Sequence, residues 1–153
     1  MLIKLANQYY YYTLSMSSLF QKYRPQQFKD VLGQDVIIKT LTNSILQQKI
    51  GHAYIFAGPK GIGKTTIAKI FSKAINCKNF NGDVCNKCDS CKTINENNTR
   101  DILELDAASN NGVDDIRNIL ESVKFLPFEH KYKVYIIDEA HMLTNQAWNA
   151  LLK

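Results

Sequence analysis

Residues 53–76 read AYIFAGPKGIGKTTIAKIFSKAIN and contain three structural signals in succession. The apolar run at 53–57 is typical of a short, fully buried strand. The next eight residues fit the pattern G-x-x-x-x-G-K-[ST], and residues 65–76 place apolar side chains on one face of a helix. A strand, a glycine-rich loop and a helix in this order form the context in which that pattern binds nucleotide phosphates.

Each position of the loop has a physical reason. Glycines permit the positive φ angles that let successive N–H groups point at an anion, and the dipole of the following helix adds to the attraction. Lys64 is placed to reach the β- and γ-phosphates, and the Thr65 hydroxyl suits Mg²⁺. A glycine turn with an incidental Lys-Thr pair is the alternative. The predicted nucleotide-binding residues here are Gly58, Pro59, Lys60, Gly61, Ile62, Gly63, Lys64, Thr65 and Thr66.

A second apolar run, VYII at 134–137, ends in the adjacent carboxylates Asp138 and Glu139. Ligands gather at the carboxyl ends of parallel strands. Asp138 is therefore predicted to hold Mg²⁺, usually through water, together with Thr65, and Glu139 to deprotonate the attacking water. With Lys64 these two acids are the predicted catalytic residues. A solvated turn is the alternative, and His141 is interpreted as a surface or capping residue.

The other apolar patterns continue the alternation of strands and helices. Helical spacing covers 34–48, 113–123 and 145–153, and a further strand is predicted at 102–105. This order predicts an α/β fold with a mostly parallel sheet that helices cover on both faces. Residues 77–100 are polar and too long for a simple connection.

All four cysteines lie within that polar stretch and fifteen residues of one another, with the spacing C-x7-C-x2-C-x2-C. Four thiolates complete the tetrahedral shell that a structural Zn²⁺ prefers. Metal binding of order 10 kcal/mol could order a loop that lacks an apolar core. An iron–sulfur cluster is the competing interpretation, and free thiols are a third. The predicted zinc ligands are Cys77, Cys85, Cys88 and Cys91.

Composition limits the class of protein. The chain has 153 residues, 45% hydrophobic and 22% charged, which is enough for one domain with a core and excludes a disordered tail. The net charge is +5, and residues 36–82 hold seven lysines and no acidic residue. An anionic partner is therefore expected, with this segment as its most basic part. No apolar stretch reaches 18 residues and residues 1–15 lack a secretory pattern, so we expect no membrane span and a reducing compartment.

Several segments together are similar to the gamma/tau subunits of bacterial DNA polymerase III, which are AAA+ ATPases of the sliding-clamp loader. They are the cysteine cluster and the sequences KYRPQQFKDVLGQ (22–34), HAYIFAGPKGIGKTTIAKIFSKAINC (52–77), LELDAASNNGVDDIR (103–117) and KVYIIDEAHMLTNQAWNALLK (133–153). The resemblance implies a P-loop NTPase of the AAA+ type, a three-layer αβα parallel sheet, with ATP, Mg²⁺ and Zn²⁺ as cofactors and Asp138 and Glu139 as Walker B acids.

The resemblance also implies a function, partners and a domain organisation. The function is loading of the sliding clamp on primed DNA during replication, coupled to ATP binding and hydrolysis. The partners are other clamp-loader subunits in a hetero-oligomer, the clamp, primed DNA and the polymerase core, in the bacterial cytoplasm and away from membranes. Residues 1–17 are expected to be an N-terminal extension, and 18–153 an ATP-binding domain with a zinc-binding insertion at about 77–91.

Two regions are assigned by the resemblance alone. Tyr23, Arg24 and Pro25, with Val31, are implied to lie over the adenine, and a charged start with an ordinary core valine stays open as the alternative. Residues 107–112 lie near the region that faces duplex DNA in related loaders. An Asn-Gly turn is the favoured interpretation there.

The family's chain continues beyond the equivalent of Lys153, so the sequence is expected to be an AAA+ domain truncated after the Walker B strand. In the AAA+ strand order 5-1-4-3-2, the run at 53–57 would lose both neighbours, and an empty position would separate Gly58–Thr65 from Asp138. Exposed sheet edges would favour aggregation.

Two functions therefore remain open. One is an ATPase motor subunit of the clamp loader. The other is a non-catalytic truncated fragment or zinc-ordered interaction module, lacking the sensor 1 strand, the arginine finger, the lid and the oligomerisation domain. A scaffold subunit of the same loader is disfavoured by the intact sequence GPKGIGKT.

Overall fold

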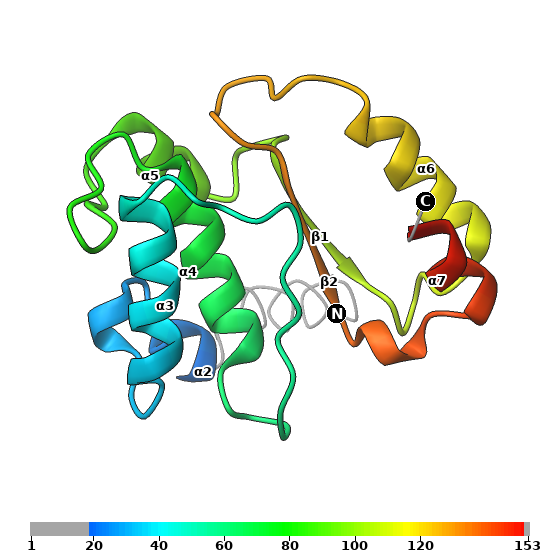
Figure 1. The fold of residues 1–153 in the computed structure, drawn as a ribbon, viewed down its shortest axis with the longest axis horizontal. Coiled ribbons are helices and arrows are strands. Elements are labelled where there is room, and N and C mark those ends of the chain that lie inside the picture. The colour runs from blue at the N-terminus through cyan, green and yellow to red at the C-terminus, as the bar shows by residue number, and fades with distance from the viewer. Residues whose placement is uncertain (1–18, 152–153) are drawn as a thin grey trace, which may run out of the picture.

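The computed structural model describes residues 19–151. The expected extension at 1–17 and the last two residues of the predicted C-terminal helix lie outside this range. The elements, labelled as in Figure 1, are α2 (Leu19–Lys22), a 3-10 turn η1 (Phe28–Asp30), α3 (Asp35–Leu46), α4 (Lys64–Asn76), α5 (Asp89–Asn95), β1 (Ile102–Asp106), α6 (Val113–Val123), β2 (Val134–Asp138), a 3-10 turn η2 (Ala140–Met142) and α7 (Asn145–Leu151).

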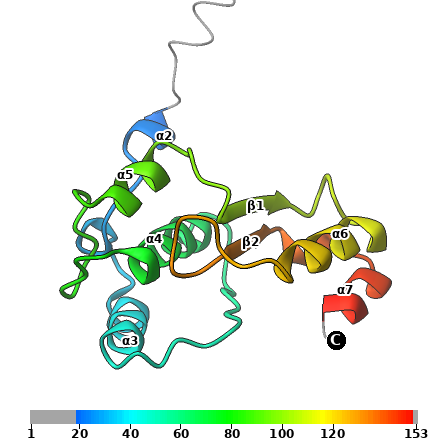
Figure 2. The same cartoon turned by 90° about the horizontal axis from the view of Figure 1, so that it is seen from above.

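The sheet in the described residues consists of β1 and β2, which run parallel. Their register pairs Ile102 with Val134 and Asp106 with Asp138, so both strands end at the same edge. Helices α3, α4 and α5 lie on one side of this strand pair, and α6 and α7 lie on the other (Figures 1 and 2). The predicted mixed α/β fold with a parallel sheet is confirmed at this level.

The predicted buried strand at 53–57 is wrong. These residues are irregular, and Ile55 is 87% exposed. An apolar run forms a strand only where a neighbour supplies the ladder hydrogen bonds, and no strand of the described residues does so. The segment is held by side chains instead. Tyr54 packs edge-on against Phe71 of α4, with ring centroids 4.8 Å apart, and Phe56 contacts the core around α4.

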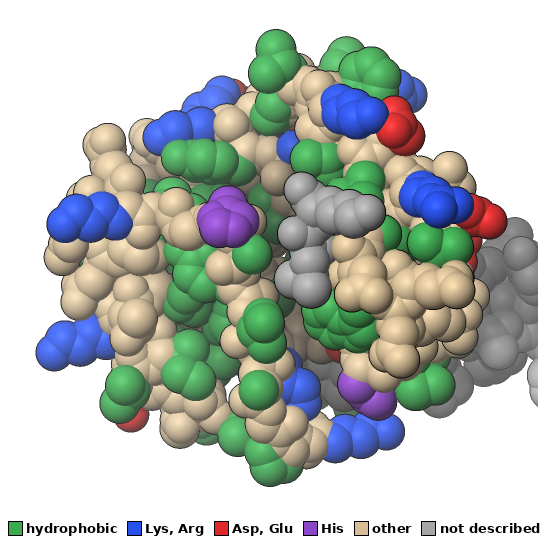
Figure 3. Space-filling model, turned by 45° about the vertical axis from the view of Figure 1, so that its right-hand side comes forward, with side chains coloured by type: hydrophobic (Ala, Val, Ile, Leu, Met, Phe, Trp, Pro, Cys, Tyr) green, Lys and Arg blue, Asp and Glu red, His purple; other side chains and the backbone are tan. Residues whose placement is uncertain are grey.

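Two apolar clusters form the core. The first joins η1, α3 and α4 to the cysteine-containing segment, and its buried residues are Phe28, Val31, Leu41, Ile67, Ile70, Phe71, Ala74 and Val84. The second joins α6 and α7 to the region after the strands, and its buried residues are Ala107, Ile116, Leu143 and Ala147. Figure 3 shows that hydrophobic side chains also reach the surface, spread over the visible face among lysine and arginine side chains. No helix between residues 19 and 151 is long and apolar enough to cross a bilayer.

The other predicted elements are present with small shifts at their ends. The helix expected at 34–48 is α3, the helix at 113–123 is α6, and both remaining strands extend one residue further than expected. The polar stretch at 77–100 contains α5, which its composition did not predict. Residues 107–109 form a turn, but the Asn-Gly turn favoured at 111–112 is not observed, because Gly112 has an extended backbone and directly precedes α6.

Candidate functional site

The glycine-rich loop lies directly before α4 and has the backbone that its sequence predicts. Gly58, Gly61 and Gly63 have φ angles of 150°, 84° and 95°. A Cβ atom at Gly61 or Gly63 would meet no atom within 4 Å, so the conformation, and not a lack of space, requires glycine there. Gly63 precedes the first turn of α4, where unpaired N–H groups and the helix dipole favour an anion.

Lys64 folds back over this loop. Its Nζ atom donates to the carbonyl oxygens of Gly58 and Pro59, both at 2.9 Å. An ammonium group has three donors, so one remains for another acceptor. These two bonds therefore hold the charge against the glycine-rich loop.

Thr65 connects the loop to the end of β2. Its hydroxyl donates to Oδ2 of Asp138 at 2.9 Å, across 73 residues of sequence. The expectation that an empty strand position separates the loop from Asp138 is therefore wrong. The side chains of Thr65 and Asp138 are in direct contact although no strand of the described residues lies between them. Neighbouring ligands of an octahedral Mg²⁺ at 2.0–2.1 Å lie about 3 Å apart, so the spacing of these two oxygens fits the ion.

Glu139 occupies an uncommon backbone conformation. Its φ angle is 49°, in the left-handed region, and its N–H donates to Oδ1 of Asp138 at 2.9 Å. Its carboxylate lies 3.5 Å from Nδ1 of His141, whose side chain is 72% exposed. Within residues 19–151 no hydrogen bond joins this carboxylate to the glycine-rich loop. The two neighbouring acids thus point to different surroundings.

The cysteine module, defined here as residues 77–95, brings its four sulfur atoms within 4.8 Å of one another. Cys77 directly follows α4, and Cys91 lies in α5 with no exposed surface. The sulfurs of Cys85 and Cys91 are 3.9 Å apart. A tetrahedral Zn²⁺ with bonds of about 2.3 Å spaces its sulfurs about 3.8 Å apart, so the cluster fits zinc.

Hydrogen bonds and burial shift the pKa values of these thiols in opposite directions. The backbone N–H of Lys87 is the main cause that lowers the pKa of Cys85 to about 6, although burial opposes it. Burial raises the pKa of Cys91 well above its usual range and raises that of Cys77 as well. Amide donors therefore favour the thiolate at Cys85, which is the form that binds metal.

Lys73 ties α4 to the cysteine module. It is only 3% exposed, and its Nζ donates at 2.8 Å to the side-chain oxygens of both Asn86 and Asn95. Burial lowers its pKa, while its electrostatic interactions with Cys91, Asp83, Cys77 and Asp30 oppose that shift. A buried ammonium group is costly unless polar or negative groups surround it, and this module supplies both.

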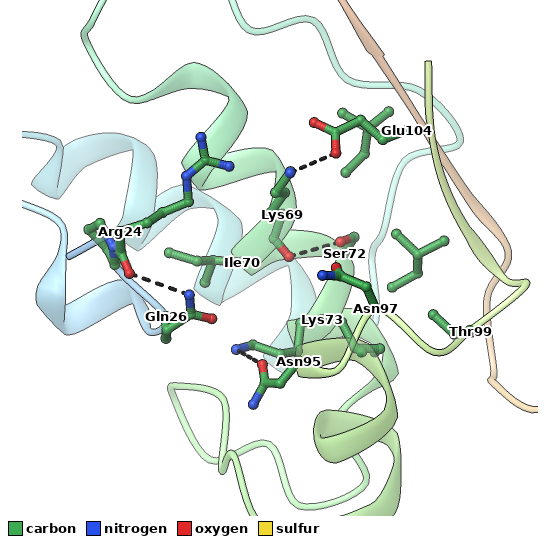
Figure 4. Close-up of a pocket in the computed structure, with 14 residues that line it drawn as sticks. Arg24, Gln26, Lys69, Ile70, Ser72, Lys73, Asn95, Asn97, Thr99 and Glu104 are labelled. Atoms are coloured by element: carbon green, nitrogen blue, oxygen red, sulfur yellow. Dashed lines mark hydrogen bonds and ion pairs between the residues drawn. The ribbon is translucent and has the colours of Figure 1, made fainter. Parts of the chain in front are cut away.

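The residues expected near the adenine are distributed over three surroundings. Val31 belongs to the apolar cluster around α4, whereas the Tyr23 side chain is 72% exposed. Arg24 and Pro25 line a cavity of about 510 Å³ beside α4, which the Lys69–Glu104 ion pair of 2.6 Å also borders (Figure 4). The link from this N-terminal segment to the loop is Gln34, whose Nε2 donates to the carbonyl of Ile62 at 3.5 Å.

Comparison with known proteins then places the chain. A family model described as "DNA polymerase III, delta subunit" matches residues 33–153. The chain belongs to this family. Its relatives include a DNA polymerase III subunit gamma/tau of Mycoplasma pneumoniae, 58% identical over 135 residues, and a subunit tau of Bacillus subtilis, 55% identical over 141 residues. A subunit tau of Escherichia coli is 42% identical over 141 residues.

These alignments cover 88%, 92% and 92% of this chain, and 20%, 25% and 22% of the three relatives. The chain thus spans about a fifth to a quarter of their length. Within the DNA polymerase III family, its resemblance to gamma/tau subunits is confirmed.

The sequence patterns did not identify two aspartates, Asp83 and Asp101, whose carboxylates bind backbone amides of distant segments. Asp101 is 1% exposed and accepts hydrogen bonds from the amides of Phe128, Glu129 and His130 at 2.7–2.9 Å. Burial by itself would raise its pKa, but these donors outweigh that effect and lower it to about 2. The available signal was an aspartate placed directly before an apolar strand. Asp83 has a similar role near η1.

Proposed function

We propose that the chain binds ATP with Mg²⁺ as the nucleotide-binding part of a clamp-loader motor subunit of bacterial DNA polymerase III. The observation that carries this proposal is the hydrogen bond between Thr65 and Asp138, because it places a hydroxyl and a carboxylate beside a glycine-rich loop. Membership of the DNA polymerase III family supplies the replication context.

The roles of the residues follow from their chemistry. The N–H groups of residues 58–66 other than Pro59 would surround the phosphates, and Lys64 would exchange its two loop carbonyls for phosphate oxygens. Thr65 and Asp138 would hold Mg²⁺, which when bound neutralises charge on the phosphates. Glu139 would turn from His141 to orient and deprotonate the attacking water. Tyr23, Arg24, Pro25 and Val31 would form the adenine side.

The wider assignments belong to the same proposal. Residues 18–153 would form an AAA+ ATP-binding domain, preceded by an extension at 1–17 and containing a zinc-binding insertion at about 77–91. Other loader subunits, the sliding clamp, primed DNA and the polymerase core would be its partners in the bacterial cytoplasm. ATP hydrolysis in the assembled oligomer would drive clamp loading.

Binding of a fluorescent ATP analogue in the presence of Mg²⁺ tests the central claim. Lys64→Ala should weaken the affinity by about tenfold or more, because a hydrogen bond from a charged group to phosphate is lost. Lys39→Ala on α3 removes an equal charge far from the loop in sequence and should leave the affinity unchanged. Equal affinities for wild type and Lys64→Ala would contradict the proposal.

Turnover separates the motor from a second candidate, a nucleotide-binding or zinc-ordered interaction module without catalysis. The segment at 53–57, directly before the loop, pairs with no strand of the described residues. This observation favours the second function, because catalysis needs a loop that the surrounding structure holds in a fixed position. ATP hydrolysis that Glu139→Gln abolishes would establish the ATPase. Tight binding with no hydrolysis by wild type would favour the module.

The metal requires its own measurement. Elemental analysis should give about one zinc per chain, because four sulfur atoms converge on one position. Cys91→Ser should lose most of it. A brown protein that contains iron and sulfide would instead identify an iron–sulfur cluster.

A further inference from the structure

Asp83 of the cysteine module forms hydrogen bonds with the segment at 27–34 near the N-terminus. Oδ1 of this residue accepts the N–H of Phe28 at 2.9 Å, and Oδ2 accepts the N–H of Lys29 at 3.1 Å. Oδ1 also accepts the N–H of Val84 at 2.8 Å. One carboxylate therefore holds the first turn of η1, more than 50 residues earlier in the chain, where charge-assisted bonds to backbone donors are strong.

Apolar packing surrounds this contact. Phe28 and Val84 are each 2% exposed and belong to the same cluster as Ile67 and Ile70 of α4. The side chain of Gln27 donates to the carbonyl of Val84 at 3.1 Å and adds a second polar link. The module, η1 and α4 thus form one packed unit.

That unit reaches the nucleotide site from two sides. Along the chain, η1 leads through Val31 to Gln34, which donates to the carbonyl of Ile62 in the glycine-rich loop. Through the core, α4 runs from the loop at Lys64 to Asn76, directly before Cys77. The loop and the cysteines therefore occupy opposite ends of a single helix, and η1 lies against that helix.

We propose that Asp83 is a positioning residue that fixes the Gln27–Gln34 segment for nucleotide binding, so that metal occupancy of the four cysteines and nucleotide affinity are thermodynamically linked. This inference rests on the proposed ATP binding. Asp83 itself touches neither the phosphate loop nor the metal position, since its partners are backbone amides.

The physical basis is the short connection between Asp83 and the cysteines. Asp83 lies two residues before Cys85, and the N–H of Cys85 donates to the sulfur of Cys77 at 3.4 Å. A metal held by these thiolates would fix the 77–85 loop and with it the carboxylate. Linkage is reciprocal, so nucleotide must then strengthen metal binding by the factor by which metal strengthens nucleotide binding.

Asp83→Asn tests the residue with little change of shape. An amide offers a single acceptor oxygen and places an NH₂ group against a backbone donor, so the hydrogen bond from the N–H of Phe28 or of Lys29 is lost. Asp89→Asn is the matched control, because Asp89 lies in the same module and its exposed side chain pairs with Lys78 on the surface. Both variants and wild type are measured as the full chain with their zinc content determined.

The expected result is a dissociation constant for Mg-ATP raised by about fivefold or more in Asp83→Asn and unchanged in Asp89→Asn. Hydrogen exchange at the amides of Phe28 and Lys29 should accelerate in Asp83→Asn alone. Wild-type affinity in a zinc-loaded Asp83→Asn protein would overturn the proposal. Failure of wild type itself to bind Mg-ATP would instead refute the proposed function, which keeps the two failures distinct.

A measurement on unmutated protein covers the case in which Asp83→Asn does not fold. Zinc is removed by a chelator and restored by titration, and Mg-ATP affinity is measured at each step. Affinity should fall on removal and recover on addition, and saturating Mg-ATP should tighten zinc binding by the same factor. Nucleotide affinity independent of zinc, in a chain that circular dichroism shows to be folded, would overturn the linkage.

Discussion

The runs AYIFA at 53–57 and VYIID at 134–138 have similar composition, yet only the second is a strand. Both contain a tyrosine at the second position and an isoleucine at the third. Ile136 of the second run is 8% exposed and is paired through the ladder with β1, whereas Ile55 of the first is 87% exposed. A buried strand therefore needs a partner as much as an apolar sequence.

The partner of β2 is held in place by a side chain. Asp101 lies directly before β1 and accepts three amides from residues 128–130, which lead into β2. Its own carbonyl also accepts the N–H of Val134 at 2.7 Å. Among residues 19–151, no comparable set of hydrogen bonds joins residues 53–57 to a strand. The difference between the two runs can be tested position by position.

The largest effect is expected at Ile136. Truncation by Ile136→Ala should lower the free energy of unfolding by about 2–4 kcal/mol, because it removes a buried side chain and enlarges the cavity that Ile136 lines beside α4. Urea unfolding followed by circular dichroism measures this change. A loss below about 1 kcal/mol would mean that β2 is not the buried strand of the pair.

Asp101→Asn should cost about 2 kcal/mol at neutral pH, and the cost should depend on pH in a defined direction. The pKa of Asp101 is about 2 in the folded chain, below the value of about 3.9 for an unfolded aspartate. Its stabilisation is therefore fully present above pH 4 to 5 and is lost as the pH falls through about 2. Unfolding of wild type and variant at several pH values should show their stabilities converging only in acid.

Phe56→Ala should have an intermediate effect of about 1–2 kcal/mol, since Phe56 is partly buried against the cluster around α4. This side chain and Tyr54 hold the first run in place without a sheet. Phe56→Leu, which keeps most of the apolar volume, should recover much of the loss in the same unfolding assay. Equal losses for both variants would indicate that packing of the ring is not what holds the segment.

Ile55→Ala should be the mildest change, within about 0.5 kcal/mol of wild type, because the side chain is already in water. It is the matched counterpart of Ile136→Ala, with the same residue type at the same position of the run. A large destabilisation by Ile55→Ala would show that 53–57 forms a buried strand in solution after all.

Local patterns predicted the elements whose determinants are local. Positive φ at the loop glycines, the apolar face of α4 and the helix α6 each depend on neighbours within a few residues, and the structure confirms them. The assignment of the four cysteines to zinc stays a prediction. The pairing of β1 with β2 followed from the alternation of strands and helices. The state of 53–57 could not be predicted from its composition, because it depends on ladder partners far away in the chain.

The connections made by single polar side chains were also beyond the sequence pattern. Asp83, Asp101 and Lys73 each bond to atoms between 13 and 55 residues away, and no periodicity marks such contacts. The meeting of Thr65 with Asp138 was obscured for the same reason. The AAA+ strand order would leave an empty position between them, whereas two short side chains close that distance.

The left-handed backbone of Glu139 has a consequence for how this position could vary. A residue other than glycine costs about 1 kcal/mol or more at φ 49°, so Glu139→Gly would relax the turn after β2 while removing the carboxylate. In the proposed ATPase, stability and chemistry would favour different amino acids at this site. Selection for thermal stability alone would then drift toward glycine, and glutamate would persist only under selection for the proposed role of its carboxylate.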